Sequence, residues 1–279
     1  MRAFITLTLT LLASTGAIAQ QTPADTAAPP KLPLWEAGFF GVAGHQQAYP
    51  GSKQHVNSGI VLPFLIYRGD WLRSEEGSVG VRALRSASTE IDVGLAGSFG
   101  SAPRDNDARR GMPRIGTLAE LGPRVKWDLG PGFGGGRWRA ALPLRAVLDV
   151  DHAFDYRGVA FEPDIGWGRR SASGWGYGVN LGLMVGSRRL AETFYEVAPQ
   201  FVTPTRPAYE AKAGLISTRL GINAFKPLSA DWRFFVFARI DTVKGAANRD
   251  SPLVDKPTGA SVGFGLAWTG WRSEQFGTP

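Results

Sequence analysis

The sequence predicts an all-β protein: a single closed antiparallel transmembrane β-barrel of about 12 strands (10–12) that comes after a cleaved signal peptide. Three observations support this fold class. The chain begins with an export leader, apolar and polar residues alternate through most of the remaining sequence, and several alternating segments are about ten residues long. Alternation at a period of two is typical of strands. Strands of ~9–11 residues can cross a bilayer, whereas soluble strands average ~5–6.

Residues 1–19 have the pattern of a secretory signal peptide. Arg2 precedes the apolar run AFITLTLTLLA, and Ala17, Ile18 and Ala19 supply a small-x-small cleavage motif. We place the cleavage between Ala19 and Gln20. The apolar run is shorter than the ~20 residues that a spanning helix needs, so we expect cleavage and not anchoring.

Residues 20–34 are rich in Pro, Ala and Thr and show no periodicity. Such a composition predicts a flexible or extended segment, here a periplasmic spacer. The period of two begins at Trp35, so residues 35–279 are expected to form the barrel.

The chain is basic, with 31 Lys and Arg against 24 Asp and Glu, and it has no cysteine. Removal of the leader takes away Arg2 and no acid, so the exported chain stays basic. Export makes nucleic acid an implausible partner and favours anionic lipid headgroups or lipopolysaccharide phosphates. Without disulfides the fold must be held by hydrogen bonds and packing. We expect an outer-membrane protein of a Gram-negative cell, exported through the periplasm.

The alternating segments, in chain order, place apolar residues on one face of each strand. These residues are Ile91, Val93, Leu95 and Phe99; Ala119, Leu121, Val125, Trp127 and Leu129; Trp138, Ala140, Leu142, Leu144, Ala146, Leu148 and Val150; Trp175, Tyr177, Val179, Leu181, Leu183 and Val185; Ile216, Leu220 and Ile222; Trp232, Phe234, Val236, Ala238 and Ile240; and Val262, Phe264, Leu266 and Trp268. In a membrane barrel this face meets lipid, and tryptophans near the strand ends form interfacial girdles.

The opposite faces carry charge and are expected to line the lumen. The predicted lumenal residues are Glu120, Arg124, Lys126, Arg137, Arg139, Arg145, Asp149, Asp151, Arg219, Arg233, Arg239 and Asp241. Three prolines conflict with continuous pairing, because a closed barrel has no free edge. We therefore expect Pro63, Pro143 and Pro163 to mark bulges or strand ends.

Catalytic and metal chemistry have weak support in this sequence. The three histidines, His45, His55 and His152, lack the spacing of a zinc site, so we expect no metal or cofactor. In HVNSG, Ser58 stands three residues after His55, and a period of two then places the pair on opposite faces. A polar turn is the favoured interpretation, and a lipid hydrolase using this pair is a minor alternative. Asp149 and Asp151 could do acid–base work, but the neighbouring arginines favour a lumenal charge network.

Five stretches together resemble the MipA/OmpV family of outer-membrane proteins, also described as MltA-interacting proteins. They occur in the family's order, and the most specific are YRGD-x-LR and RRGMP-x-x-G-x-x-x-ELGP. The stretches are Trp35 to Ser52, Val61 to Arg73, Ala108 to Pro123, Leu142 to Val147 and Asp250 to Val254.

The resemblance implies an outer-membrane barrel without enzymatic activity. One family member is described as a scaffold that links a lytic murein transglycosylase to a penicillin-binding murein synthase, and other members look like osmotically regulated or adhesion-related barrels. We therefore expect a scaffold linked to peptidoglycan synthesis and turnover. A small-solute pore or an adhesion-related barrel remains an open alternative.

Glycine and proline in the family motifs are typical of sharp turns at a barrel rim. The motif residues expected there are Tyr49, Pro50, Gly51, Arg68, Gly69, Asp70, Arg109, Arg110, Gly111 and Pro113. The charged residues among them either pair with one another, which we favour, or contact a partner. The chain departs from the family at Ala48 and Lys53, which stand at usually acidic positions, and it ends without a terminal aromatic residue.

Overall fold

The computed structural model describes residues 32–68, 82–85, 89–98 and 106–277. The expected signal peptide with Ala19 and Gln20, most of the segment 20–34, and the motif residues Gly69 and Asp70 lie outside these ranges.

The described part of the chain is all-β, with twelve strands in one antiparallel sheet. The strands are β1 (Trp35–Gln47), β2 (His55–Tyr67), β3 (Arg82–Arg85), β4 (Thr89–Ser98), β5 (Leu118–Pro131), β6 (Arg137–Asp149), β7 (Asp155–Phe161), β8 (Asp164–Arg170), β9 (Gly176–Gly186), β10 (Gly214–Pro227), β11 (Trp232–Thr242) and β12 (Thr258–Arg272). The predicted number of strands is therefore confirmed within these residues.

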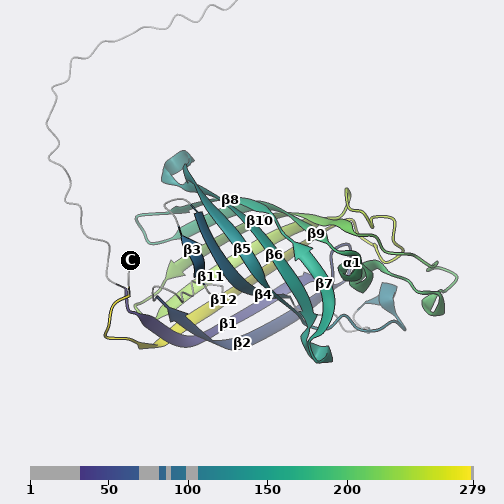
Figure 1. Cartoon of the computed structure of the whole chain (residues 1–279), viewed down its shortest axis with the longest axis horizontal. Coiled ribbons are helices and arrows are strands. Elements are labelled where there is room, and N and C mark those ends of the chain that lie inside the picture. Colours follow the sequence, from purple (N-terminus) through teal and green to yellow (C-terminus); the bar gives the residue numbers. More distant parts are fainter. Residues whose placement is uncertain (1–31, 69–81, 86–88, 99–105, 278–279) are drawn as a thin grey trace, which may run out of the picture.

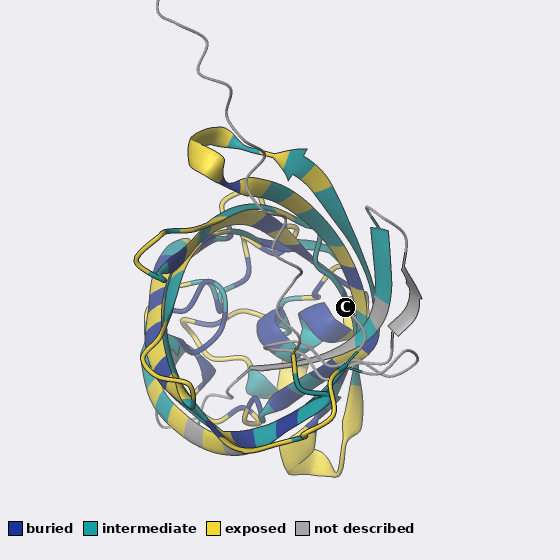
Figure 2. Cartoon of the chain, turned by 90° about the vertical axis from the view of Figure 1, so that its left-hand side faces the viewer, coloured by how far each residue is buried: buried dark blue, intermediate teal, exposed yellow. Residues whose placement is uncertain are grey.

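The sheet is one continuous path in the order β2-β1-β12-β11-β10-β9-β7-β6-β5-β4-β3, with β8 between β6 and β9. β7 and β8 are consecutive in the chain and both pair with β6 and β9, so together they fill one position of the path. Figure 2 shows this path curled into a ring of strands. Within the described residues the pairing runs from β2 at one end to β3 at the other.

Period-two alternation sets the two faces of the curled sheet. In β9, Val179 and Leu181 are exposed, whereas Met184 on the opposite face is 4% exposed. β12 repeats the pattern, since Phe264 and Leu266 are exposed and Ser261 is buried. The apolar residues thus face outward, as expected for a sheet whose outer side meets lipid.

Two of the three prolines coincide with interruptions of the sheet. Pro163 lies between β7 and β8, and Pro143 lies opposite this break, where its carbonyl accepts the Glu162 amide at 3.0 Å. Pro63 differs from the prediction, because it sits inside β2 in unbroken register with Phe39 of β1. β2 is the last strand of the described path, and a strand with a neighbour on one side only tolerates proline more readily than a central strand does.

The two ends of the ring differ (Figure 1). One end, which we call the turn end, has the short connections 132–136, 171–175 and 228–231 and carries the first and last described residues, 32 and 277. The other end carries longer connections and the single α-helix of the described residues, α1 (Arg188–Tyr195). We call the segments 48–54, 106–117, 188–213 and 243–257 the plug, because their side chains form the main buried cluster with inward residues of the strands, among them Val147, Met184 and Ile216.

The terminal segments are tied together at the turn end. Pro33 and Phe276 form an isolated β-bridge, and Leu34 N donates to Gln275 O at 2.7 Å. The last residues of the expected spacer are therefore bonded to the segment that follows β12. No helix in the part of the chain that the structure describes is long and apolar enough to span a membrane.

Candidate functional site

Two buried tyrosines join the segments of the plug. The Tyr49 hydroxyl donates to the Leu253 carbonyl at 2.6 Å, and the Tyr195 hydroxyl donates to the Pro50 carbonyl at 3.0 Å. Their rings meet edge to face with centroids 6.5 Å apart. Burial raises the pKa of both phenols, so both are neutral at ordinary pH. The family motif around Tyr49 thus forms the centre of the plug.

Arg109, expected at an exposed rim, is instead buried in the plug and 6% exposed. It donates to the carbonyls of Phe194 at 3.1 Å and Pro113 at 3.3 Å, and its guanidinium lies 5.8 Å from the centre of the Tyr49 ring. Burial lowers its pKa. The contacts of Arg109 are internal, but its partners are backbone carbonyls and an aromatic face and not another charged motif residue.

Of the neighbouring motif residues, Arg110 and Gly111 lie at the outside of the plug, whereas Gly51 is buried. Arg110 is exposed and pairs with Asp107, and Gly111 adopts a φ of 82°, a left-handed conformation that favours glycine. Gly51 has a φ of 96° in the tight turn after Tyr49. All three residues lie in turns.

Arg206 is a further plug residue, and no pattern in the sequence singled it out. Its guanidinium donates to the carbonyls of Ala108 at 2.8 Å and Arg110 at 3.0 Å, and also to Phe201 at 2.7 Å. It therefore holds the segment 106–117 against the segment after α1. Only the folded chain brings these carbonyls together.

Below the plug, six charged side chains form an alternating charge ladder along the inner wall. Glu120 and Glu162 both accept from Arg145, at 3.1 and 2.7 Å. Glu162 also pairs with Arg219, which pairs with Asp241 at 3.1 Å, and Asp241 pairs with Arg239 at 2.7 Å. The charge ladder is Glu120, Arg145, Glu162, Arg219, Asp241 and Arg239. Five of its six members are predicted lumenal residues, and Glu162 was missed because it lies at the break between β7 and β8.

The other predicted lumenal charges form smaller, separate groups. Lys126 pairs with Glu90 at 3.4 Å, Arg137 with Asp128 at 2.9 Å, and Asp149 with Arg157 at 2.8 Å. Arg139 is exposed near the start of β6, and Arg124 lies in β5 opposite Pro143.

Asp151 does not lie on a strand face, in contrast to the prediction. The strand β6 ends at Asp149, and the chain turns into a short 3-10 helix at Val150–His152. The exposed Asp151 carboxylate there accepts from the Thr117 amide at 2.9 Å. The period of two therefore ends two residues earlier than predicted.

A second charge cluster lies at the turn end around Glu36, which is 5% exposed. Its carboxylate lies 2.7 Å from Arg68 and 3.6 Å from both Arg233 and Arg272. Arg68 also donates to the Pro33 carbonyl at 2.9 Å. The motif arginine Arg68 is therefore an internal partner that fastens the N-terminal segment to the sheet.

Aromatic side chains gather at the turn end. Phe39, Trp268 and Trp271 contact one another, and Phe133 stacks on Trp167 with ring centroids 4.5 Å apart. Such rings are typical of the membrane interface, where one edge is apolar and the other is wet.

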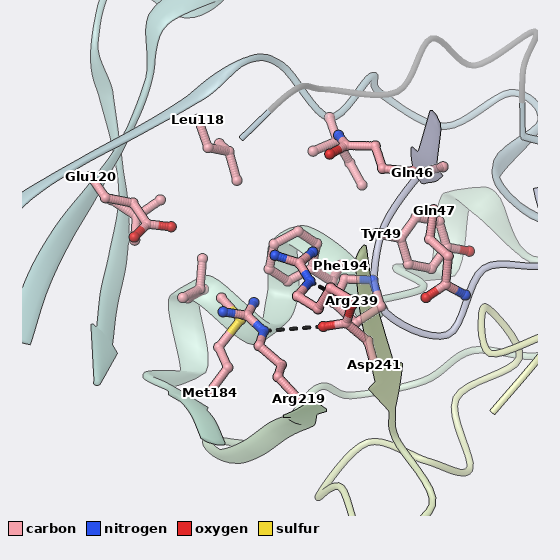
Figure 3. A pocket seen from close by; sticks show the side chains of 15 residues that line it. Gln46, Gln47, Tyr49, Leu118, Glu120, Met184, Phe194, Arg219, Arg239 and Asp241 are labelled. Atoms are coloured by element: carbon pink, nitrogen blue, oxygen red, sulfur yellow. Dashed lines mark hydrogen bonds and ion pairs between the residues drawn. The ribbon is translucent and has the colours of Figure 1, made fainter. Parts of the chain in front are cut away.

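A partly open cavity of about 70 Å³ lies between the plug and the charge ladder (Figure 3). Its polar wall includes Glu120, Arg219, Arg239 and Asp241, and its apolar wall comes largely from the plug.

The Ser58–His55 pair shows no catalytic contact. The Ser58 hydroxyl is buried without a hydrogen-bond partner, whereas the His55 ring stacks on His45 with centroids 4.6 Å apart. A nucleophilic serine needs a base within hydrogen-bond reach. In the described part of the chain, no group of three or more His, Cys, Asp or Glu residues is arranged to hold a metal.

The family profile of "MltA-interacting protein MipA" matches residues 40–270. This chain belongs to the MipA family. The buried motifs of the plug and the curled sheet lie within the matched range. Family membership, together with the apolar outer face, indicates an outer-membrane protein.

No curated protein matches this MipA-family chain significantly. Among solved structures it is similar to the NanC porin, with a TM-score of 0.41 and 10% identity over 82% of this chain and 98% of that chain. It is also similar to the COG4313 outer membrane channel from Pseudomonas putida F1, with a TM-score of 0.38 and 10% identity over 90% of this chain and 100% of that one.

Proposed function

We propose that this protein is a closed outer-membrane β-barrel, exported by a cleaved signal peptide, that serves as a non-enzymatic docking scaffold for a lytic murein transglycosylase and a penicillin-binding murein synthase. One observation favours a scaffold over a pore. The long connections at one end of the ring are folded into a buried plug. Tyr49, Arg109 and Tyr195 are committed to internal contacts there. The family name supplies the class of partner.

We infer the docking face from the lengths of the connections at the two ends of the barrel. Outer-membrane barrels have short periplasmic turns and longer extracellular loops. The turn end would then face the periplasm, where murein enzymes act, and it also carries residues 32–34, the described end of the expected spacer. Arg137 and Arg169 are exposed at this end, next to the aromatic pair Phe133 and Trp167. This face, and not the plug, is our docking surface.

A pull-down with purified components tests this role. The mature protein in lipid nanodiscs should retain a purified lytic murein transglycosylase above the level of an unrelated barrel. Charge reversal at the turn end, Arg137→Glu with Arg169→Glu, should reduce retention at least several-fold. The matched reversal at the plug, Lys244→Glu with Arg249→Glu, should not. Equal retention by the unrelated barrel would remove the scaffold proposal.

A solute pore is the second candidate, because the cavity beneath the plug is lined with charge. Planar-bilayer recording separates the two functions. A plugged scaffold should give no discrete conductance steps, and loosening the plug with Arg109→Ala should create them. Regular steps from the unaltered protein would instead favour the pore.

A further inference from the structure

The two ends of the charge ladder face the same cavity. Inside the ladder each charge lies between two opposite charges: Arg145, Glu162, Arg219 and Asp241 each have two partners. The terminal members, Glu120 and Arg239, each have one partner within the ladder, and both line the cavity. The negative end of the charge ladder, Glu120, and its positive end, Arg239, therefore both face this cavity.

The positive end is the guanidinium of Arg239. Its Nε donates to Asp241 at 2.7 Å, and its side chain is 42% exposed. Figure 3 shows the rest of the guanidinium pointing away from Asp241 toward the cavity. A guanidinium offers a fork of N–H donors that suits a carboxylate.

The negative end is the carboxylate of Glu120, on the opposite side of the cavity in Figure 3. Its partner Arg145 also pairs with Glu162, and the Arg145–Glu162 distance of 2.7 Å is shorter than the Arg145–Glu120 distance of 3.1 Å. Glu120 is 8% exposed, so its carboxylate has little water to complete its hydrogen bonds. An ammonium group is the complementary ligand for such a carboxylate.

The remaining walls limit the size and the chemistry of a ligand. Apolar side chains, among them Ile115, Leu118, Leu190 and Phe194, cover the side toward the plug. At roughly 10–15 Å³ for each water-sized unit, 70 Å³ holds about five to seven non-hydrogen atoms. A simple anion would pair with Arg239 but would give Glu120 no second partner. A simple amine would pair with Glu120 but would give Arg239 no second partner.

We propose that this cavity binds a small zwitterion of the α-amino acid class, with its ammonium on Glu120, its carboxylate on Arg239 and a short apolar side chain against Leu190 and Phe194. The bound zwitterion completes the alternating charge ladder. This site is independent of the docking role, because it lies inside the sheet and not at the turn end.

Three molecules of nearly equal size test the site on the unaltered protein. L-alanine carries both charges, L-lactate lacks the ammonium, and L-alaninamide lacks the carboxylate. Ligand-observed NMR with the protein in nanodiscs should show L-alanine binding at least ten-fold more tightly than either analogue. Equal binding of all three, or binding of none, overturns the proposal.

Single variants then assign each end. Arg239→Gln should weaken L-alanine at least ten-fold and leave L-alaninamide unchanged, because the amide has no carboxylate to lose. Glu120→Gln should weaken L-alanine and leave L-lactate unchanged. The control Arg137→Gln, outside the cavity, should leave the binding of all three molecules unchanged.

Heat-modified gel mobility verifies that each variant is folded. If Glu120→Gln fails to fold, the comparison of the three molecules and the Arg239→Gln variant still test the proposal.

Discussion

Tyr49 is the residue on which most of the plug converges. Its ring contacts Tyr195 and the Arg109 guanidinium, and its hydroxyl donates to the Leu253 carbonyl. Because the hydroxyl is buried, its removal leaves a carbonyl without this donor and without ready access to water.

Tyr49→Phe should therefore lower the free energy of unfolding by about 1–3 kcal/mol. Denaturant titration of the protein in lipid vesicles measures this. The control Tyr177→Phe changes a residue that is exposed on the outer face of β9, and surface changes of this kind usually stay within about 0.5 kcal/mol. Equal effects of the two variants would contradict the role of the Tyr49 hydroxyl.

The buried phenols also make the plug sensitive to alkali. The pKa of Tyr49 and of Tyr195 is raised in the folded state, whereas an unfolded tyrosine has a pKa of about 10. Their contribution to stability is complete below that pH and is lost as pH rises above it, because the unfolded chain then releases protons that the folded chain retains. The free energy of unfolding should fall above pH about 10, and the double variant Tyr49→Phe with Tyr195→Phe should show a flatter decline.

Single residues also mark the limit of sequence reasoning. The alternation correctly predicted which side of β9 carries Val179 and Leu181, because strand geometry fixes it locally. It provided no reason to bury Arg109, whose acceptors belong to Phe194 and Pro113, both outside the strands with a period of two. Burial of a loop arginine depends on neighbours that only the tertiary fold supplies.

At the scale of elements, α1 was not predicted. Its signals are nevertheless present: Ser187 caps the helix by accepting from Leu190 N, and Leu190, Ala191, Phe194 and Tyr195 form one buried face. The helix is only eight residues long and stands between two strong strand patterns, so the period of two on either side obscures it.

Ser187→Ala should destabilise the protein by about 0.5–2 kcal/mol, because the hydroxyl also accepts from Val159 N at 3.0 Å. Differential scanning calorimetry in vesicles measures the shift. Ser173→Ala, in the exposed turn between β8 and β9, is the matched control. An unchanged melting temperature in Ser187→Ala would show that the cap is dispensable for anchoring α1.

At the scale of the whole molecule, the proposed orientation can be tested with single cysteines. The natural chain has no cysteine, so any labelling reports the introduced residue. Lys244→Cys, exposed at the plug, should react with a membrane-impermeant maleimide in intact cells. Ser173→Cys, exposed at the turn end, should react only after the outer membrane is permeabilised. The reverse labelling pattern would show that the barrel has the opposite orientation, and the docking face would then be at the plug.

The plug also implies an order of events during folding. The Tyr49–Leu253 bond joins residues 204 positions apart, and the Tyr195–Pro50 bond joins residues 145 positions apart. Contacts between such distant segments form late, because the intervening chain must first be arranged. β12 begins shortly after Leu253, so the plug is completed only when the last strand is in place. An incompletely assembled barrel would lack these contacts and expose the apolar side chains of α1, a difference that quality-control proteases could detect.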